Sequence, residues 1–278
     1  MGIELKNVCA EDFEILEPPD VPNKIFYKGS YHDLPDLLIT RIAGMSYFAY
    51  ALVRLMKRMG VRVMNSASSI ELAEDKLRTV QVLSANNLPI PTSILAKYPI
   101  DKEIIAEKLG FPMIMKTVLG AKGEGIALLQ DYNQFKDVVT LVQKSTEGKA
   151  NIIFQKYISD SFGRDLRVFV VGGKAIGAAL RTGAEGSFKS NVSAGGSASS
   201  YPLNDEIADL AVKAANALGL SIAGVDLLFH KDGYLIAEVN SCPSIKGFES
   251  TTNFTLNIPK LILERATEML RGDKTDNC

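Results

Sequence analysis

The chain has 278 residues, which is enough for about two domains of ordinary size. Its composition, with 46% hydrophobic and 23% charged residues, is typical of a globular protein, and no apolar run reaches the ~20 residues that a membrane span needs. The formal net charge of −1 excludes general electrostatic binding to nucleic acid or to an anionic membrane surface.

The first 70 residues predict a small α/β unit. The start of the chain, MGIELKNVCAEDFEIL, has no basic flank before an apolar core, so we expect no signal peptide and a cytoplasmic protein. A buried strand is expected over 34–43. The next segment, SYFAYALVRLMKRMG, predicts a helix that Ser46 caps and Gly60 ends.

The segment 68–158 predicts a second α/β unit. Ser68 and Glu71 form an S-x-x-E pattern, which predicts one capped helix over 68–87. The elements expected after it are an extended segment over 88–96, a helix over 101–110, strands over 111–119 and 126–130, a helix over 131–143 and a strand over 151–158.

The remainder of the chain predicts two hairpins separated by a helix. The first hairpin spans 165–181 with Gly-Gly in its turn, and the second spans 224–240. Between them, Asn204 predicts the N-cap of a helix that ends before Gly219. A last helix is expected over 258–270.

The turn of the second hairpin decides which of its residues face each other. A three-residue turn, Lys231–Gly233, places Asp226 opposite Glu238 and puts Asn240 on the same face. Two carboxylates about 4 Å apart near a protein surface repel by about 4 kcal/mol. This arrangement therefore needs a cation, a shared proton or a different register.

Two interpretations of these acids stay open at this point. A two-residue Asp-Gly turn would put Asp226 and Glu238 on opposite faces, where they are ordinary solvated acids. Alternatively, they hold a metal ion. Because the chain has only three cysteines, far apart, and two histidines, such a site must use oxygen ligands, which favours Mg²⁺.

The first hairpin shows a related pattern. A three-residue turn, Gly172–Lys174, places Asp165 opposite Arg181, with Arg167 on the same face. One interpretation is a cross-strand ion pair of little value to stability. The other is an arginine clamp for phosphate or carboxylate.

A glycine-rich loop, GAKGEG, follows the strand that contains Lys116. Its glycines allow backbone N–H groups to close around phosphates, although a simple hairpin turn has the same composition. Lys116 favours the phosphate interpretation, because a lysine among apolar residues is costly unless an anion meets its charge.

Together these pieces resemble the ATP-grasp superfamily and, within it, the RimK-like α-L-glutamate ligases. The resemblance covers the chain from about Ser68 to the C-terminus. It is carried, in order, by AEDKLRTVQVLSANNLPIPTS, PMIMKTVLGAKGEGIAL, IIFQKYI, GRDLRVFVVGGKAIGAALR, GSFKSN, AGVDLL and AEVNSCPSIKGFESTT.

The resemblance implies an α+β/α/β fold in which two α+β subdomains grip ATP. The expected division is an N-terminal pre-ATP-grasp-like α/β domain over 1–70, a lid or central subdomain over 71–155, a catalytic subdomain over 156–272 and a polar tail over 273–278. Relatives of this kind begin with a further strand and helix, so we expect the first domain to be short and incomplete.

The resemblance also implies site residues. Contacts to ATP are expected from Lys76, Lys116, the loop glycines Gly120, Gly123 and Gly125, the segment Gln155, Lys156, Tyr157 and Ile158, and Asp165. Metal ligands are expected at Asp226, Glu238 and Asn240, with Mg²⁺ as the ion and Mn²⁺ as its alternative. Contacts to the acyl or phosphoryl group are expected from Arg167, Arg181 and Asn191.

The implied activity is ATP- and Mg²⁺-dependent ligation of a carboxylate to an amine through an acyl phosphate, in a homo-oligomer. The amino acid is glutamate or a similar one, and the acceptor is a carboxylate of a peptide, protein tail or metabolite. The chain departs from the family pattern at Pro243–Lys246 and at Thr182, which follows Arg181. Two alternatives therefore remain: a peptide-modifying ligase that forms a non-glutamate or intramolecular bond, and a nucleotide-binding protein without turnover.

Overall fold

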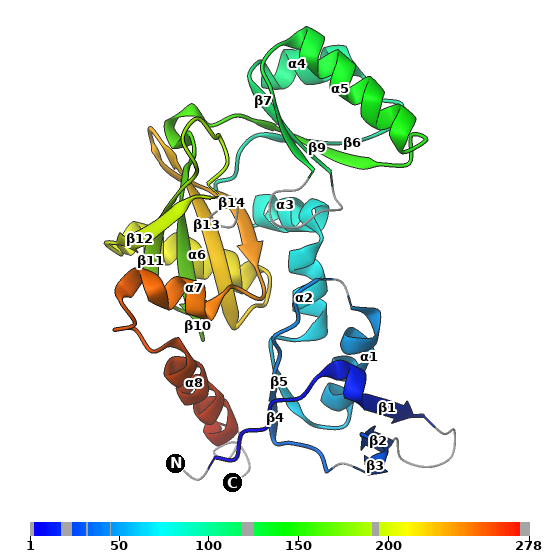
Figure 1. Cartoon of the computed structure of the whole chain (residues 1–278), viewed down its shortest axis with the longest axis vertical. Helices are drawn as coiled ribbons and strands as arrows, with labels where there is room; N and C mark the ends of the chain where they lie inside the picture. The colour runs from blue at the N-terminus through cyan, green and yellow to red at the C-terminus, as the bar shows by residue number, and fades with distance from the viewer. Residues whose placement is uncertain are drawn as a thin grey trace.

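The computed structural model describes residues 3–17, 24–31, 33–44, 46–117, 125–190 and 195–272. These residues form four sheets of three, two, four and five strands. An N-terminal unit lies at one end, and two consecutive helices connect it to the two larger sheets (Figure 1). No described helix combines the length and the apolar composition that a membrane span needs.

The N-terminal unit holds the two small sheets around one long helix. Three antiparallel strands form one sheet, and two parallel strands form the other. As predicted, Ser46 caps the helix by accepting a hydrogen bond from the backbone N–H of Ala49. The elements are η1 (Ala10–Asp12), β1 (Phe13–Leu16), β2 (Lys24–Tyr27), β3 (Ser30–Tyr31), β4 (Leu37–Ile39), α1 (Tyr47–Arg58) and β5 (Arg62–Met64).

The single helix predicted over 68–87 is wrong, because the segment folds as α2 (Ala67–Glu74) and α3 (Lys76–Ala85). Ser66, not Ser68, caps α2, and Glu71 pairs with Arg54 of α1 instead of completing a capping box. The helix is interrupted at Asp75, which caps α3: its carboxylate accepts hydrogen bonds from two backbone N–H groups of that helix. The break places Lys76 at the first position of α3.

The four-stranded sheet has the order β6-β9-β7-β8. Helices α4 and α5 cover one of its faces, where Phe135 and Phe154 lie in a closed core (Figure 1). The register puts Lys116, Ile153 and Gln155 on the opposite face. The elements are β6 (Ser93–Lys97), α4 (Lys102–Leu109), β7 (Met113–Thr117), β8 (Ile126–Leu129), α5 (Tyr132–Ser145) and β9 (Asn151–Lys156).

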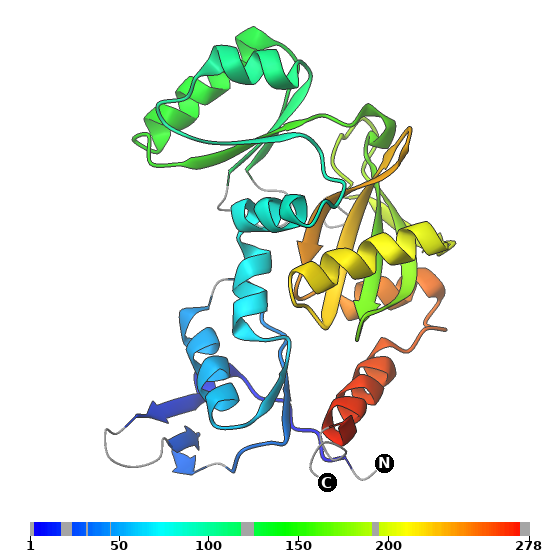
Figure 2. The same ribbon diagram turned by 180° about the vertical axis from the view of Figure 1, so that it is seen from behind.

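The five-stranded sheet has the order β12-β11-β10-β13-β14. Helix α6 packs along one face, as Figure 2 shows, over Leu166, Val168 and Val225. Part of the other face packs against α7 and α8. The elements are η2 (Ser159–Ser161), β10 (Arg164–Val171), β11 (Lys174–Thr182), β12 (Ser197–Tyr201), α6 (Asp205–Ala217), β13 (Ile222–His230), β14 (Gly233–Asn240), α7 (Ile245–Glu249), η4 (Ser250–Thr252) and α8 (Ile258–Gly272).

Both predicted three-residue turns are wrong, yet the facing pairs predicted from them are confirmed. The turns contain two residues, because Val171 pairs with Lys174 and His230 pairs with Gly233. Further along each hairpin, a β-bulge leaves one residue without a cross-strand partner, Ile176 in β11 and Ala237 in β14. This extra residue shifts the pairing by one position, as a third turn residue would have done. As a result, Asp165 faces Arg181, and Asp226 faces Glu238.

Asn65 joins the N-terminal unit to the five-stranded sheet. Its side chain is 1% exposed and donates to the carbonyls of Ile222 and Ser241 at 2.7 and 3.2 Å. Its Oδ1 accepts from the backbone N–H groups of Ser221 and Ile222 at 2.7 and 2.9 Å. One amide thus satisfies four backbone groups beside the end of β14.

We expect Asn65→Ala to lower the free energy of unfolding by roughly 3 kcal/mol, because four backbone groups lose the hydrogen bonds that the buried amide makes with them. Urea denaturation of the full chain measures this loss. Asn86→Ala is the matched control, since its exposed amide bonds only Val82, and it should change stability by less than ~0.5 kcal/mol. Equal losses in the two variants would contradict the structural role of Asn65.

Candidate active site

The predicted charged residues gather on one face of the five-stranded sheet. The strand register pairs Arg167 with Asp226. Two residues that pair directly across neighbouring strands point to the same face of the sheet, so the pairs Asp165–Arg181 and Asp226–Glu238 lie on that face as well. This face is opposite to the one that α6 covers. The residues on it are Asp165, Arg167, Arg181, Asp226, Glu238 and Asn240.

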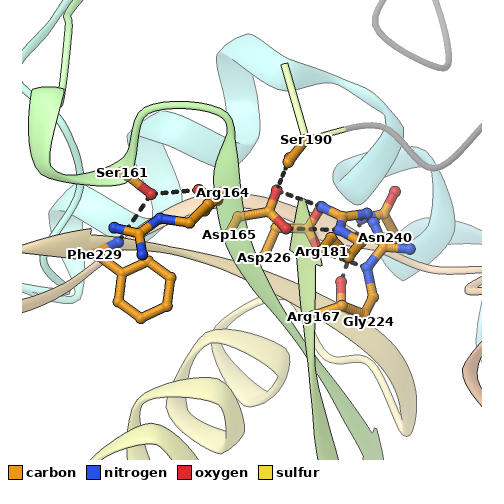
Figure 3. A network of polar contacts seen from close by, with 10 residues as sticks. All are labelled: Ser161, Arg164, Asp165, Arg167, Arg181, Ser190, Gly224, Asp226, Phe229 and Asn240. Carbon is orange, nitrogen blue, oxygen red and sulfur yellow. Dashed lines mark hydrogen bonds and ion pairs between the residues drawn. The ribbon is translucent and has the colours of Figure 1, made fainter. Parts of the chain in front are cut away.

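Asp226 is the centre of this group and is only 3% exposed. Arg167 binds both of its carboxylate oxygens, with Nε–Oδ1 and Nη2–Oδ2 distances of 2.5 and 2.7 Å. Arg181, on β11 two strands away, also reaches Oδ2, at 2.7 Å (Figure 3). Burial alone would raise the pKa of Asp226, but the two guanidinium groups outweigh it and hold the pKa below its usual range.

Arg181 connects Asp226 to a second buried acid. It forms a bidentate pair with Asp165, with both N–O distances 2.6 Å, and the Ser190 hydroxyl also donates to Asp165 (Figure 3). Burial raises the pKa of Asp165, whereas the two carboxylates together raise the pKa of Arg181. Arg181 is therefore permanently charged and held by two anions.

The oxygen donors at the end of β14 fit a hard cation such as Mg²⁺. Glu238 is exposed and, among the described residues, its carboxylate has no hydrogen bond or ion pair. Asn240 donates its Nδ2 to the carbonyl of Gly224 at 3.3 Å, which leaves its Oδ1 as an acceptor. With Asp226 they offer two carboxylates and one amide oxygen, the ligand type that Mg²⁺ prefers. The described residues contain no group of three or more His, Cys, Asp or Glu side chains that could hold a metal ion, so a site here would include the Asn240 amide beside the two carboxylates.

Lys116 lies across from these acids on the four-stranded sheet. Burial lowers its pKa, and the neighbouring Lys76 lowers it further, while Glu238 and Asp226 act in the opposite direction. Two half-buried lysines of like charge that line one pocket favour an anionic ligand between them, because an anion compensates both charges.

A pocket lies between α3, the open face of the four-stranded sheet and β14. Most of its lining side chains are apolar, and Lys76, Lys116 and Glu238 bring charge to it. The lining residues are Ala73, Lys76, Thr79, Val80, Leu83, Ile90, Lys116, Ile126, Ile153, Gln155, Ile236, Ala237 and Glu238. The pocket is thus an apolar cleft with a charged side that leads to the metal donors.

The segment predicted to meet a nucleobase lies at the end of β9. Gln155 is buried and lines the pocket, whereas Lys156 is exposed and donates its backbone N–H to the carbonyl of Thr92 at 2.9 Å. The Tyr157 hydroxyl is buried with no hydrogen-bond partner among the described residues. Ile158 follows, and its carbonyl accepts from the backbone of Ser161.

Three predicted site residues, Gly120, Gly123 and Asn191, lie outside the described residues. Gly125 is described and adopts a φ of +70°, and its carbonyl accepts a hydrogen bond from Thr117 at 2.9 Å. Glycine adopts this positive φ without the steric cost that a side chain would impose.

Sequence reasoning missed several residues of the site. Ser190 was not selected, although its hydroxyl binds Asp165, and Ser93 was read only as part of an extended segment, although it pairs with Gln155. Thr79 and the isoleucines of the pocket were not selected as site residues either. Only the pairing of distant strands places these side chains in one cleft, and no local pattern records that pairing.

Comparison with known proteins agrees with this geometry. The model of the RimK-like ATP-grasp domain matches residues 73–265. A probable alpha-L-glutamate ligase of Aliivibrio fischeri (strain MJ11) is 39% identical over 231 residues, which cover 82% of this chain and 76% of that protein. A protein of the same name in Legionella pneumophila (strain Corby) is 35% identical over 237 residues, which cover 84% and 77%.

The fold has solved counterparts among ATP-grasp ligases. The ATP-grasp ligase PsnB, in complex with a phosphomimetic variant of minimal precursor, Mg and ADP, is similar with a TM-score of 0.68 and 21% identity. The similarity covers 92% of this chain and 86% of that one. The predicted ATP-grasp fold is therefore confirmed, and the chain belongs to the RimK-like ATP-grasp family.

Proposed function

We propose that the chain is an ATP- and Mg²⁺-dependent carboxylate–amine ligase that adds glutamate or a similar amino acid to a carboxylate. The observation that carries this proposal is the junction between the pocket and the charged face. Lys116 and Glu238 line one pocket, Glu238 faces Asp226 across β13 and β14, and Arg167 and Arg181 bind Asp226. Phosphate, metal and carboxylate are the ligands that these three groups recognise in turn.

Each group has a role in this reaction. Lys76 and Lys116 bind ATP phosphates, and Asp226, Glu238 and Asn240 would hold Mg²⁺, which supplies charge neutralisation at the phosphates. The acceptor carboxylate attacks the γ-phosphate to give an acyl phosphate and ADP. The amine then attacks the acyl carbon, and phosphate leaves. Arg167 and Arg181 stabilise the oxyanion charge that develops in both steps.

Glutamate is the favoured amino acid, because the two relatives compared above are named probable alpha-L-glutamate ligases. A peptide or protein carboxylate is the favoured acceptor, supported by the complexes of PsnB with precursor peptides. The second candidate is a peptide-modifying ligase that forms a different bond. The departure at Pro243–Lys246 favours it, since this segment begins three residues after Asn240 and its Ser244 caps the short helix α7.

The test is incubation of the full chain with ATP, Mg²⁺, single amino acids and peptide acceptors, with ADP and product mass as readouts. A mass increase of one or more glutamate residues on an acceptor supports the first candidate. Loss of water within one peptide supports the second. No ADP and no adduct with any combination would overturn both and leave a nucleotide-binding protein without turnover.

We expect Glu238→Gln to reduce Mg²⁺-dependent turnover at least about 100-fold, because the amide lacks the charge that a divalent ion needs. Folding should change little, since the carboxylate is exposed and makes no bond within the described chain. Titration of Mg²⁺ into the ADP-bound protein measures the weaker ion affinity directly. Glu249→Gln on α7 serves as control, and unchanged Mg²⁺ affinity in Glu238→Gln would refute the metal assignment.

A further inference from the structure

Arg41 connects the N-terminal unit to the loop that follows the proposed metal donor Asn240. It lies two residues after β4, and its exposed guanidinium donates an Nη2 proton to the carbonyl of the buried Pro243 at 2.5 Å. Among the residues that the structure describes, Arg41 has no carboxylate partner and no other side-chain hydrogen bond. A guanidinium has five N–H donors in a planar fork, so four remain, which is enough for a bidentate pair with a carboxylate.

The backbone that carries Arg41 is held in place beside this contact. The neighbouring Thr40 donates its hydroxyl proton to the carbonyl of Asn65 at 2.8 Å. Asn65 in turn donates its amide to the carbonyl of Ser241 at 3.2 Å, two residues before Pro243. The N-terminal unit therefore holds the loop at two carbonyls, and this double contact fixes the position of Arg41 relative to the five-stranded sheet.

Pro243 brings this contact to the charged face of the sheet. A Cβ atom built at Gly224 would lie 2.8 Å from Pro243 Cβ and 3.1 Å from Arg167 Cδ, and Figure 3 shows Gly224 beside Arg167. Pro243 Cβ and Arg167 Cδ are therefore no further apart than these two distances combined. Pro243 thus lies between Arg41, which binds its carbonyl, and Arg167, which lies beside its ring.

The charge balance of this face distinguishes Arg41 from the other two arginines. Arg167 and Arg181 carry two positive charges, and the buried Asp165 and Asp226 supply the two matching negative charges. These four groups compensate one another, whereas the charge of Arg41 meets no carboxylate within the described chain. Arg41 therefore offers the positive charge that a further carboxylate at this face needs.

We propose that Arg41 is a specificity-determining residue that binds a carboxylate of the amine-donating amino acid. This inference rests on the proposed function, in which an amino acid supplies the amine and keeps its own carboxylates. The acceptor carboxylate becomes an acyl phosphate, and its charge is met by the metal ion together with Arg167 and Arg181. The carboxylates of the incoming amino acid do not react and stay charged in every step. A fixed guanidinium beside the buried ion pairs, but not part of them, matches this requirement.

The test measures the KM of the amine donor for the full chain with saturating ATP, Mg²⁺ and an acceptor peptide. Arg41→Ala should raise the KM for L-glutamate about 10- to 100-fold, the usual effect of losing a hydrogen-bonded charge pair. The kcat and the affinity for ADP should change by less than about threefold, because the lost contact is made equally before and during the reaction. Arg41→Lys keeps the charge without the planar fork, so it should restore only part of the loss.

Two mono-amides of glutamate separate a direct contact from a structural role. L-Glutamine lacks the side-chain charge, and the α-amide of L-glutamic acid lacks the main-chain charge. The native chain should show a higher KM for the amide that lacks the carboxylate bound by Arg41, and Arg41→Ala should change that KM by less than about threefold. Arg58→Ala, which removes an exposed guanidinium paired with Glu17 in the same unit, is the matched control and should leave all three KM values unchanged.

The outcomes that overturn the inference differ from those that overturn the proposed function. If Arg41→Ala raises the KM of glutamate and of both amides equally, or changes none of them, the ligase stands but Arg41 binds no donor carboxylate. If only the KM of the acceptor peptide rises, the carboxylate at Arg41 belongs to the acceptor and the assignment is wrong. If the native chain releases no ADP and forms no adduct, the proposed function itself fails, and the inference fails with it.

Discussion

Asp226→Asn should lower the free energy of unfolding by about 3–5 kcal/mol and reduce turnover at least about 1,000-fold. The reason lies in the charge balance of the buried group. Arg167 has no carboxylate partner other than Asp226 among the described residues, whereas Arg181 keeps Asp165. The neutral amide leaves the half-buried Arg167 guanidinium uncompensated, and it also removes a carboxylate from the proposed metal site.

The two effects are measured separately, by urea denaturation and by ADP release. Glu71→Gln breaks the exposed pair with Arg54 and is the matched control, with a loss below ~1 kcal/mol. A loss in Asp226→Asn no larger than in this control would show that the buried pairing contributes nothing to stability.

The stability difference between native chain and Asp226→Asn should also depend on pH. The arginines lower the folded-state pKa of Asp226 beneath its unfolded value of about 3.9. Its contribution to stability is therefore fully present above that unfolded value and is lost as the pH falls through the folded-state pKa. Denaturation at pH 7 should show the full difference, and denaturation in acid should show a smaller one.

The sequence predicted which residues share the charged face of the five-stranded sheet better than it predicted the turns of the two hairpins. Asp226 opposite Glu238 was correct, but the turn assumed for it was not, since the extra residue lies at Ala237 instead of in the turn. The hairpin with Asp165 and Arg181 repeats this compensation at Ile176. A bulge and a turn with one more residue shift the cross-strand pairing by the same one position, so counting residues along the hairpin cannot distinguish them.

The contacts between elements were not predictable from local patterns. The link from Arg167 to Asp226 depends on β10 lying between β11 and β13, a strand order that no single hairpin contains. The break at Asp75 likewise overrides a helical pattern that continues through it, because the aspartate caps α3 better than it extends α2. The residue types were enough to predict the chemistry of the site, whereas the contacts between its side chains depend on the strand order of the sheet.

Arg181→Ala should reduce turnover at least about 1,000-fold while nucleotide affinity changes by less than about 10-fold. Arg181 is charged at every accessible pH and binds two buried carboxylates, which fixes its guanidinium at the junction of the proposed acyl and phosphoryl positions. A group held in this way stabilises developing oxyanion charge without reorganising. It contacts neither the apolar pocket nor Lys116, so ground-state nucleotide binding should remain.

Arg181→Lys separates charge from geometry at this position. Lysine keeps the positive charge but cannot form both bidentate contacts, so most of the loss in turnover should persist. Arg164→Ala on the neighbouring strand β10 removes an exposed guanidinium that stacks on Phe229 and should leave turnover within about threefold of the native chain. Single-turnover measurement with saturating ATP gives the chemical step, and calorimetry with ADP gives the affinity. A large loss of affinity with unchanged turnover would place Arg181 in the nucleotide site and remove it from the chemistry.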